Sequence, residues 1–158
     1  MPCNTAHHFA PAIRAAVTIP FIDMVALSVA HAATLASPGG TVGILASPAV
    51  RKVGLFDAPF ARAGLTPVYA ADEAATLGII RNIKSEGPGD SARAGLAAAS
   101  RALQDQGARV QMIACTEFSL IASALSPAIR SFDTLDCLVE AIIAFAAPGR
   151  DGTSQAAG

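Results

Sequence analysis

The stretch Val110-Gln-Met-Ile-Ala-Cys-Thr-Glu117 decides the fold class of this 158-residue chain. Val110 to Ala114 form a short, mostly apolar run, which is typical of a strand buried inside a parallel sheet. At Cys115 the run gives way to a polar turn. Open α/β sheets bind their ligands beside the carboxyl ends of the strands. The stretch therefore predicts an α/β protein in which Cys115 lies at the ligand-binding edge of a sheet.

Further short apolar runs predict other strands, and helical patterns separate them. The strands are expected at residues 18–22, 41–46, 66–70, 109–114 and 128–132. Helices are expected within 2–17, 23–36, 47–63, 72–84, 90–106, 117–125 and 133–146, with Asp23, Asp72 and Asp133 as N-caps. Strands that alternate with helices predict a three-layer lobe built on a mostly parallel sheet.

Composition excludes several classes of function. The formal net charge is −1, and the chain has no tryptophan and one tyrosine, so no basic stripe or stacking platform is available for nucleic acid. Asp23 and His31 interrupt the apolar stretch at 15–36, which predicts neither a signal peptide nor a membrane span. Three cysteines cannot form a complete disulfide set, and no zinc-like spacing joins them to the histidines. A cytoplasmic protein with free thiols and no metal is therefore expected.

The sequence around Cys3 and Cys115 favours acid–base chemistry. Cys3 lies in Met1-Pro-Cys-Asn-Thr-Ala-His7, and a threonine closely follows each cysteine. A helix N-terminus and the hydroxyls of Thr5 and Thr116 are expected to lower the pKa of the thiols. A thiolate and a thiol on opposite faces of a Cα–H would remove a proton from one face and return it to the other without a cofactor. The alternative, which spacing alone favours, is that each cysteine is a small buried hydrophobic residue.

The two cysteine motifs resemble the active-site motifs of the aspartate/glutamate racemase superfamily. Met1 to His7 is similar to the aspartate racemase branch, and Ala114-Cys-Thr-Glu117 is similar to the second motif. Supporting segments follow in the same order within residues 1–146: Ile19-Pro-Phe-Ile22, Val42-Gly-Ile-Leu-Ala46 and Ile83-Lys84. The resemblance implies a PLP-independent isomerase, a cofactor-independent racemase of aspartate or glutamate. It also implies two α/β lobes that each supply one catalytic cysteine.

The resemblance implies particular roles for residues of both motifs. Cys3 and Cys115 would be the acid–base thiols. The residues expected to bind the substrate are Asn4, Thr5, Ser47, Lys84, Thr116 and Glu117. Other roles fit the same residues: helix caps for Asn4 and Thr5, a solvated charge for Lys84, and a cap or a group that tunes Cys115 for Glu117. The neighbouring residues His7, His8 and Cys137 are expected to lie behind the site, at the surface or in packing.

The chain departs from the family in its substrate loop and at its start. Ala49-Val50 stands where the family has a Gly-Thr pair, so a hydroxyl donor is missing, and Ala114 stands in place of a glycine. The family also has a longer segment before the first cysteine, which holds the first strands of lobe one. Residues 1–38 and 126–146 are therefore expected to be a remnant of lobe one. Residues 39–125 would be lobe two, and 147–158 a disordered tail.

A remnant of this kind would leave apolar helix faces uncovered, which predicts a homo-oligomer or another partner. Three explanations stay open: a chain that begins after the true start, a shortened protein that completes its site through another chain, or a non-catalytic relative that binds or assembles. The expected partner is a small-molecule substrate, an acidic amino acid or a related carboxylate. Hydantoin racemisation, maleate isomerisation and malonate decarboxylation also stay open, because the substrate contacts differ from those of the family.

Overall fold

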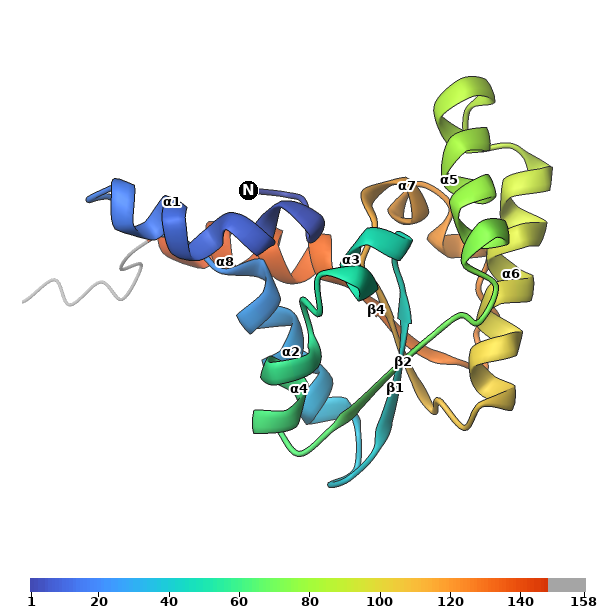
Figure 1. Cartoon of the computed structure of the whole chain (residues 1–158), viewed down its shortest axis with the longest axis horizontal. Coiled ribbons are helices and arrows are strands. Elements are labelled where there is room, and N and C mark those ends of the chain that lie inside the picture. Colours follow the sequence, from blue (N-terminus) through green and yellow to red (C-terminus); the bar gives the residue numbers. More distant parts are fainter. Residues whose placement is uncertain (148–158) are drawn as a thin grey trace, which may run out of the picture.

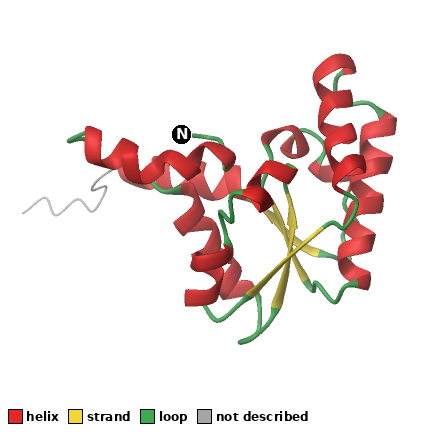
Figure 2. Cartoon of the chain, viewed as in Figure 1, coloured by secondary structure: helices red, strands yellow, loops and turns green. Residues whose placement is uncertain are grey.

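A computed structural model, which describes residues 1–147, contains a parallel four-stranded sheet between two layers of helices (Figures 1 and 2). The strands are β1 (Thr41–Leu45), β2 (Thr66–Tyr69), β3 (Val110–Ile113) and β4 (Arg130–Asp133), in the order β2-β1-β3-β4. The helices are α1 (Ala10–Ala16), α2 (Met24–Leu35), α3 (Pro48–Lys52), α4 (Asp57–Arg62), α5 (Glu73–Glu86), α6 (Asp90–Asp105), α7 (Thr116–Ser119) and α8 (Thr134–Ala146), with 3-10 turns η1 (Thr5–Phe9) and η2 (Ala122–Ala124). The predicted three-layer α/β class is confirmed.

The strands send alternate side chains into two separate cores. Val42, Ile44 and Met112 point to one face, where they pack with buried residues of α2 and α4. Leu45 and Ile113 point to the other face, where they pack with α5 and α6. Burying one such side chain stabilises the fold by about 1.5–3 kcal/mol, so both helix layers hold the sheet in place.

Gln111 is the polar exception inside β3, and its side chain is fully buried. Ser100 of α6 donates from its hydroxyl to Gln111 Oε1 at 2.7 Å, and Gln111 Nε2 donates to the Ser100 carbonyl at 2.8 Å. Both ends of the amide are therefore satisfied, which removes the cost of burying it. The pair ties α6 to the strand that leads to Cys115.

Aspartates begin three of the helices at the predicted residues. Asp23, Asp72 and Asp133 each accept a hydrogen bond from a backbone N–H in the first turn, at 3.0, 2.8 and 2.8 Å. Each carboxylate thereby satisfies a donor that has no partner within its own helix. Helices α2, α5 and α8 accordingly start where the sequence predicted.

Residues 18–22 do not form the predicted strand. They form a loop between α1 and α2, and the Ile19 side chain is 72% exposed. Pro20 has no N–H to donate to a neighbouring strand, and the segment lies outside the sheet, so nothing pairs with it. The predicted helix at 117–125 is divided into α7 and η2, and the one at 47–63 into α3 and α4.

Helix α8 packs on α2 at one side of the molecule (Figure 1). Within its predicted apolar stripe Leu138 is buried, whereas Val139, Ile142 and Ile143 are 44%, 45% and 61% exposed. Phe145 adds a further exposed ring. The division of the chain into a remnant of lobe one and lobe two stays a prediction, and of the predicted tail, 148–158 lie outside the described residues.

Candidate active site

The strand order creates a switch point between β1 and β3. From β1 the chain passes to β2 on one side, and β3 is added on the other side. The Ala114 N–H donates to the Leu45 carbonyl at 2.8 Å, which keeps the two strand ends in register. Ser47 and Cys115 therefore leave the sheet next to each other. In open parallel sheets the crevice at such a point is the usual ligand site.

All eight residues predicted for the site line one pocket at this crevice. Its volume is about 180 Å³, and its lining is Cys3, Asn4, Thr5, Ser47, Ile80, Lys84, Ala114, Cys115, Thr116 and Glu117. The N-terminal segment, the loop after β1, helix α5 and the turn after β3 each contribute to the wall. Drug-sized ligands occupy pockets of roughly 300–1,000 Å³, so this volume favours a smaller molecule.

A tight turn after β3 brings Glu117 back onto Cys115. Cys115 has the extended backbone of an N-cap residue, and its carbonyl accepts hydrogen bonds from the N–H groups of Phe118 and Ser119 at 2.9 and 3.1 Å. Within this turn the thiol of Cys115 donates to Glu117 Oε2 at 3.0 Å. Lys84, in the last turn of α5, places Nζ 3.0 Å from Glu117 Oε1. The two carboxylate oxygens thus contact a thiol and an ammonium group.

Burial raises the pKa of the Cys115 thiol to about 12, and the hydrogen bond to Glu117 and its negative charge act in the same direction. Burial also disfavours ionisation of Glu117, but hydrogen bonds from Cys115 and Lys84 outweigh it and lower the pKa of that carboxyl. The backbone N–H groups of Glu117 and Phe118 at the start of α7 do lower the pKa of Cys115, but burial and the Glu117 carboxylate outweigh them, so the expected net lowering is wrong. Helix α7 has only four residues, and a carboxylate lies against the thiol.

Lys84 links the two thiols electrostatically. The hydrogen bond with Glu117 and its negative charge raise the pKa of Lys84, and the negative charge that Cys115 and Cys3 carry when ionised acts in the same direction. Both cysteines therefore lie within electrostatic range of one ammonium group. The Lys84 side chain is 65% exposed, which leaves its remaining N–H donors accessible from the pocket.

The N-terminal segment is fastened to the rest of the site by Asn4 and Thr5. Asn4 is buried, and its Nδ2 donates to Thr134 Oγ1 at 2.9 Å in the first turn of α8. The Thr5 hydroxyl lies 3.5 Å from that of Ser47 in the loop after β1. Cys3 itself is exposed. These contacts bring the first cysteine to the switch point, although the second lies 112 positions further along the chain.

Sequence reasoning missed Ile80, which forms an apolar wall of the pocket. It lies one helical turn before Lys84 on α5, and this spacing would have placed both side chains on one face. Cys137 lies on α8 and does not line the pocket, and its packing role stays a prediction.

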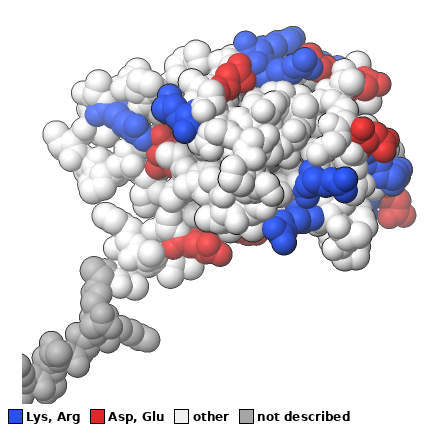
Figure 3. Space-filling view, turned by 90° about the horizontal axis from the view of Figure 1, so that it is seen from below, with Lys and Arg blue, Asp and Glu red and all other residues white. Residues whose placement is uncertain are grey.

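Charge and metal-binding groups are sparse in the described part of the chain. Within residues 1–147 no three His, Cys, Asp or Glu side chains lie close enough together to hold a metal ion. Over the same residues no helix combines the length and apolarity needed to cross a membrane. On the face seen in Figure 3, the charged side chains of both signs are scattered over a mostly uncharged surface.

The chain is a doubly wound α/β protein with a thiol-lined pocket at its switch point, the place where open parallel sheets commonly bind ligands. The sequence matches the family described as Asp/Glu/Hydantoin racemase over residues 1–142. The chain belongs to this family, which confirms the resemblance carried by its two cysteine motifs.

Solved structures of racemases have the same fold. The aspartate racemase of Picrophilus torridus is 20% identical, with a TM-score of 0.75 over 90% of this chain and 59% of its own. A putative Asp/Glu racemase from Yersinia pestis is 21% identical, with a TM-score of 0.76 over 90% of this chain and 63% of its own. The glutamate racemase of Francisella tularensis is 17% identical, with a TM-score of 0.65 over 89% of this chain and 53% of its own. The chain thus spans about three fifths of the length of the first two proteins.

Proposed function

We propose that this chain is a cofactor-independent, PLP-independent racemase of the aspartate/glutamate type, with Cys3 and Cys115 as its two acid–base thiols. One observation carries the proposal. A single pocket at the switch point gathers both thiols, an ammonium group and several hydroxyls from four separate parts of the chain. A cytoplasmic location is part of the proposal, since all three cysteines are free and thiols persist under reducing conditions.

The high pKa of Cys115 assigns it the role of acid in the resting protein. In one direction the Cys3 thiolate takes the proton from the substrate Cα, and the Cys115 thiol delivers its own proton to the opposite face of the resulting carbanion. Cys3 then holds a proton and Cys115 is a thiolate, so the next inversion runs in the opposite direction. Lys84 stabilises the Cys115 thiolate, because its positive charge offsets the negative charge of Glu117.

The remaining wall residues suit a substrate with carboxylate and amino groups. We assign the accessible N–H donors of Lys84 to a substrate carboxylate, and the hydroxyls of Thr5, Ser47 and Thr116 to carboxylate or amino groups. Asn4 is buried and is also held by its hydrogen bond to α8. Glu117 was predicted to bind substrate, but both its oxygens already have partners. We propose instead that it tunes Cys115 and reaches the substrate only through the thiol.

Exchange of the Cα proton in D2O tests this proposal. The purified chain is incubated with L- and D-aspartate and L- and D-glutamate, and loss of the Cα-proton signal is followed by NMR together with inversion. Cys3→Ser and Cys115→Ser are each expected to lower racemisation by roughly 10²–10⁴-fold. Each variant keeps one thiol. Exchange of the Cα proton in one enantiomer is therefore expected to fall less than the conversion of one enantiomer into the other. Cys137→Ser is the matched control and keeps full activity.

Absence of exchange with all four amino acids would reject the amino-acid racemase. Hydantoins, maleate and malonate derivatives are assayed next, as substrates of the alternative chemistries. A chain that is inactive on all of them would be a relative that only binds or assembles.

The exposed apolar side chains of α8 support a homo-oligomer as the working form. Four apolar residues of this one short helix are each at least 44% exposed: Val139, Ile142, Ile143 and Phe145. Single exposed apolar residues are normal on a protein surface, whereas several close together usually mark an interaction site. Residues 1–38 and 126–146 would then be the remnant of a first lobe, and 39–125 the second lobe. Association would cover the apolar side chains that this remnant leaves open to water.

A further inference from the structure

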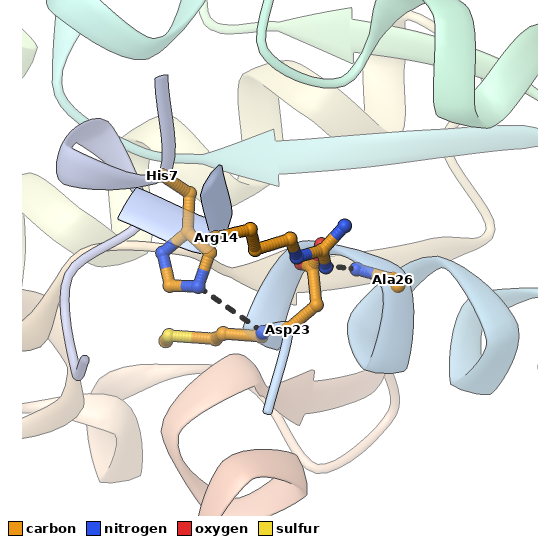
Figure 4. Close-up of polar contacts among 5 residues, drawn as sticks. His7, Arg14, Asp23 and Ala26 are labelled. Atoms are coloured by element: carbon orange, nitrogen blue, oxygen red, sulfur yellow. Dashed lines mark hydrogen bonds and ion pairs between the residues drawn. The ribbon is translucent and has the colours of Figure 1, made fainter. Parts of the chain in front are cut away.

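His7 contacts two backbone groups that belong to different parts of the chain. Its Nδ1 lies 2.8 Å from the carbonyl oxygen of Cys3. Its Nε2 lies 3.2 Å from the backbone nitrogen of Met24, and Figure 4 draws this contact as a dashed line from the His7 ring. The side chain is only 3% exposed and meets the ring of Phe21 edge-on. Met24 is the first residue of α2, so its N–H has no partner inside that helix.

These contacts determine the tautomer of the imidazole. A backbone N–H can only donate, so Nε2 must present a lone pair to Met24. A carbonyl oxygen can only accept, so Nδ1 must carry the proton and donate it to Cys3. One neutral imidazole thereby satisfies a donor at the start of α2 and an acceptor at Cys3. A protonated imidazole would lose the bond from Met24, because it has no lone pair to offer.

The segment that carries Cys3 has few other fixed points. It lies before the first helical residue of η1 and is anchored through Asn4 to α8 and through Thr5 to Ser47. An ion pair between Arg14 and the N-cap residue Asp23 fastens the following helix α1 to the start of α2 (Figure 4). Among the side-chain hydrogen bonds of residues 1–147, the one to His7 reaches the backbone of Cys3 itself.

We propose that His7 is the positioning residue of Cys3. As the neutral Nδ1–H tautomer, it holds the backbone of that cysteine in place relative to the N-terminus of α2. The proposal rests on the acid–base role proposed for Cys3. A misplacement of about 1 Å can lower a rate roughly 10²-fold, so a thiol on an exposed segment needs such an anchor. His7 does not touch the substrate pocket, whose lining excludes it.

Two substitutions separate the two contacts. His7→Asn keeps an amide group near the position of Nδ1, so it can still donate to Cys3 but no longer reaches Met24. His7→Gln extends its amide to the position of Nε2, so it can accept from Met24 but leaves the Cys3 carbonyl without its donor. The matched controls are His8→Asn and His8→Gln, since His8 is exposed and only meets Phe9 edge-on.

The expected result is a crossed pattern in NMR measurements that need no substrate. In His7→Gln the backbone order parameter of Cys3 falls from about 0.85 toward 0.6, while the Met24 amide stays protected from hydrogen exchange. In His7→Asn the order parameter of Cys3 is retained and the Met24 amide exchanges roughly fivefold faster. Equal changes in both variants would mean that His7 only fills space, and would overturn the proposal.

Two further readouts complete the test. Nitrogen shifts of the wild-type imidazole are expected to show a protonated Nδ1 and an unprotonated Nε2; the opposite tautomer would overturn the proposal without any variant having to fold. In the racemase assay, His7→Gln is expected to lower kcat roughly 10²-fold at unchanged KM, and His7→Asn to stay close to wild type. A chain that shows the crossed pattern and the Nδ1–H tautomer but racemises nothing would reject the proposed function and leave the anchoring of Cys3 intact.

Discussion

The thiol of Cys115 donates to the carboxylate of Glu117, only two residues further along the chain, at 3.0 Å. The contact places a negative charge beside a half-buried thiol, and burial already favours the protonated form of that thiol. A cysteine at the end of a parallel strand is thereby held as an acid, whereas the general environment of such a position would favour the thiolate.

Replacing Glu117 is expected to make Cys115 more acidic. In Glu117→Gln the negative charge is lost, so the pKa of the thiol falls from about 12, and the thiolate fraction near neutral pH rises about tenfold for each unit of decrease. The pH dependence of iodoacetamide alkylation at Cys115, followed by peptide mass spectrometry, measures this shift. Glu86→Gln removes the same charge two residues beyond Lys84 and is expected to leave the profile unchanged. An unaltered profile in Glu117→Gln would show that burial alone holds the thiol protonated.

Removing the ammonium of Lys84 is expected to weaken substrate binding and to leave Glu117 without its counter-charge. Lys84→Met should raise the pKa of Glu117, because the ion pair is one of the interactions that lower it. It should also raise KM roughly tenfold or more, because a charged hydrogen bond to the substrate carboxylate is lost. Lys52→Met, at the exposed end of α3, is the control for loss of one positive charge.

The double variant Lys84→Met, Glu117→Gln decides how Lys84 acts. If Lys84 contacts the substrate, its removal still raises KM when Glu117 is neutral. If the double variant instead has the same KM as Glu117→Gln alone, Lys84 acts only through Glu117, and the substrate contact assigned to it is wrong.

Two glycine-to-alanine substitutions on neighbouring helices are expected to have different effects on stability. A Cβ at Gly95 in α6 would lie 2.8 Å from Ile79 Cγ1 of α5, whereas a Cβ at Gly78 in α5 would meet no atom within 4 Å. Both gain the same helix propensity, so Gly78→Ala should raise the free energy of unfolding by about 0.5–1 kcal/mol. Gly95→Ala should be less stable than Gly78→Ala by roughly 1–3 kcal/mol, measured by urea unfolding. Equal stabilities of the two variants would mean that α5 and α6 move apart enough to accept the extra methyl group at no cost.

Charges on the exposed face of α8 are expected to weaken self-association. Ile143→Glu and Phe145→Glu each replace a side chain that is about 60% exposed, so the monomer should keep its stability. Sedimentation velocity over a range of protein concentrations is expected to show a larger monomer fraction for both variants. Val53→Glu, a partly exposed apolar residue at the end of α3, should leave the association unchanged. A wild-type chain that is monomeric at all concentrations would reject the proposed homo-oligomer.

Local patterns predicted most of the elements of this fold. Asp23, Asp72 and Asp133 cap the helices they were expected to begin, because an N-cap acts within its own first turn. The strand at 18–22 was wrong for a non-local reason, since a run of apolar residues becomes a strand only where another strand pairs with it. Likewise, the pKa of Cys115 depends on burial and on the packing of Glu117, and neither is visible in the spacing of the motif.

The sequence by itself determined the α/β class, the family and the polar residues that line the pocket, but not its apolar wall at Ile80, because strand and cap signals are local and the two cysteine motifs are specific. Only the tertiary structure decided how these residues meet. The order β2-β1-β3-β4 places the ends of β1 and β3 side by side, and contacts through Asn4, Thr5 and His7 bring Cys3 to the same crevice. The physical reason is that strand order, burial and the pairing of charges arise from contacts between residues far apart in the chain, which no single stretch of sequence contains.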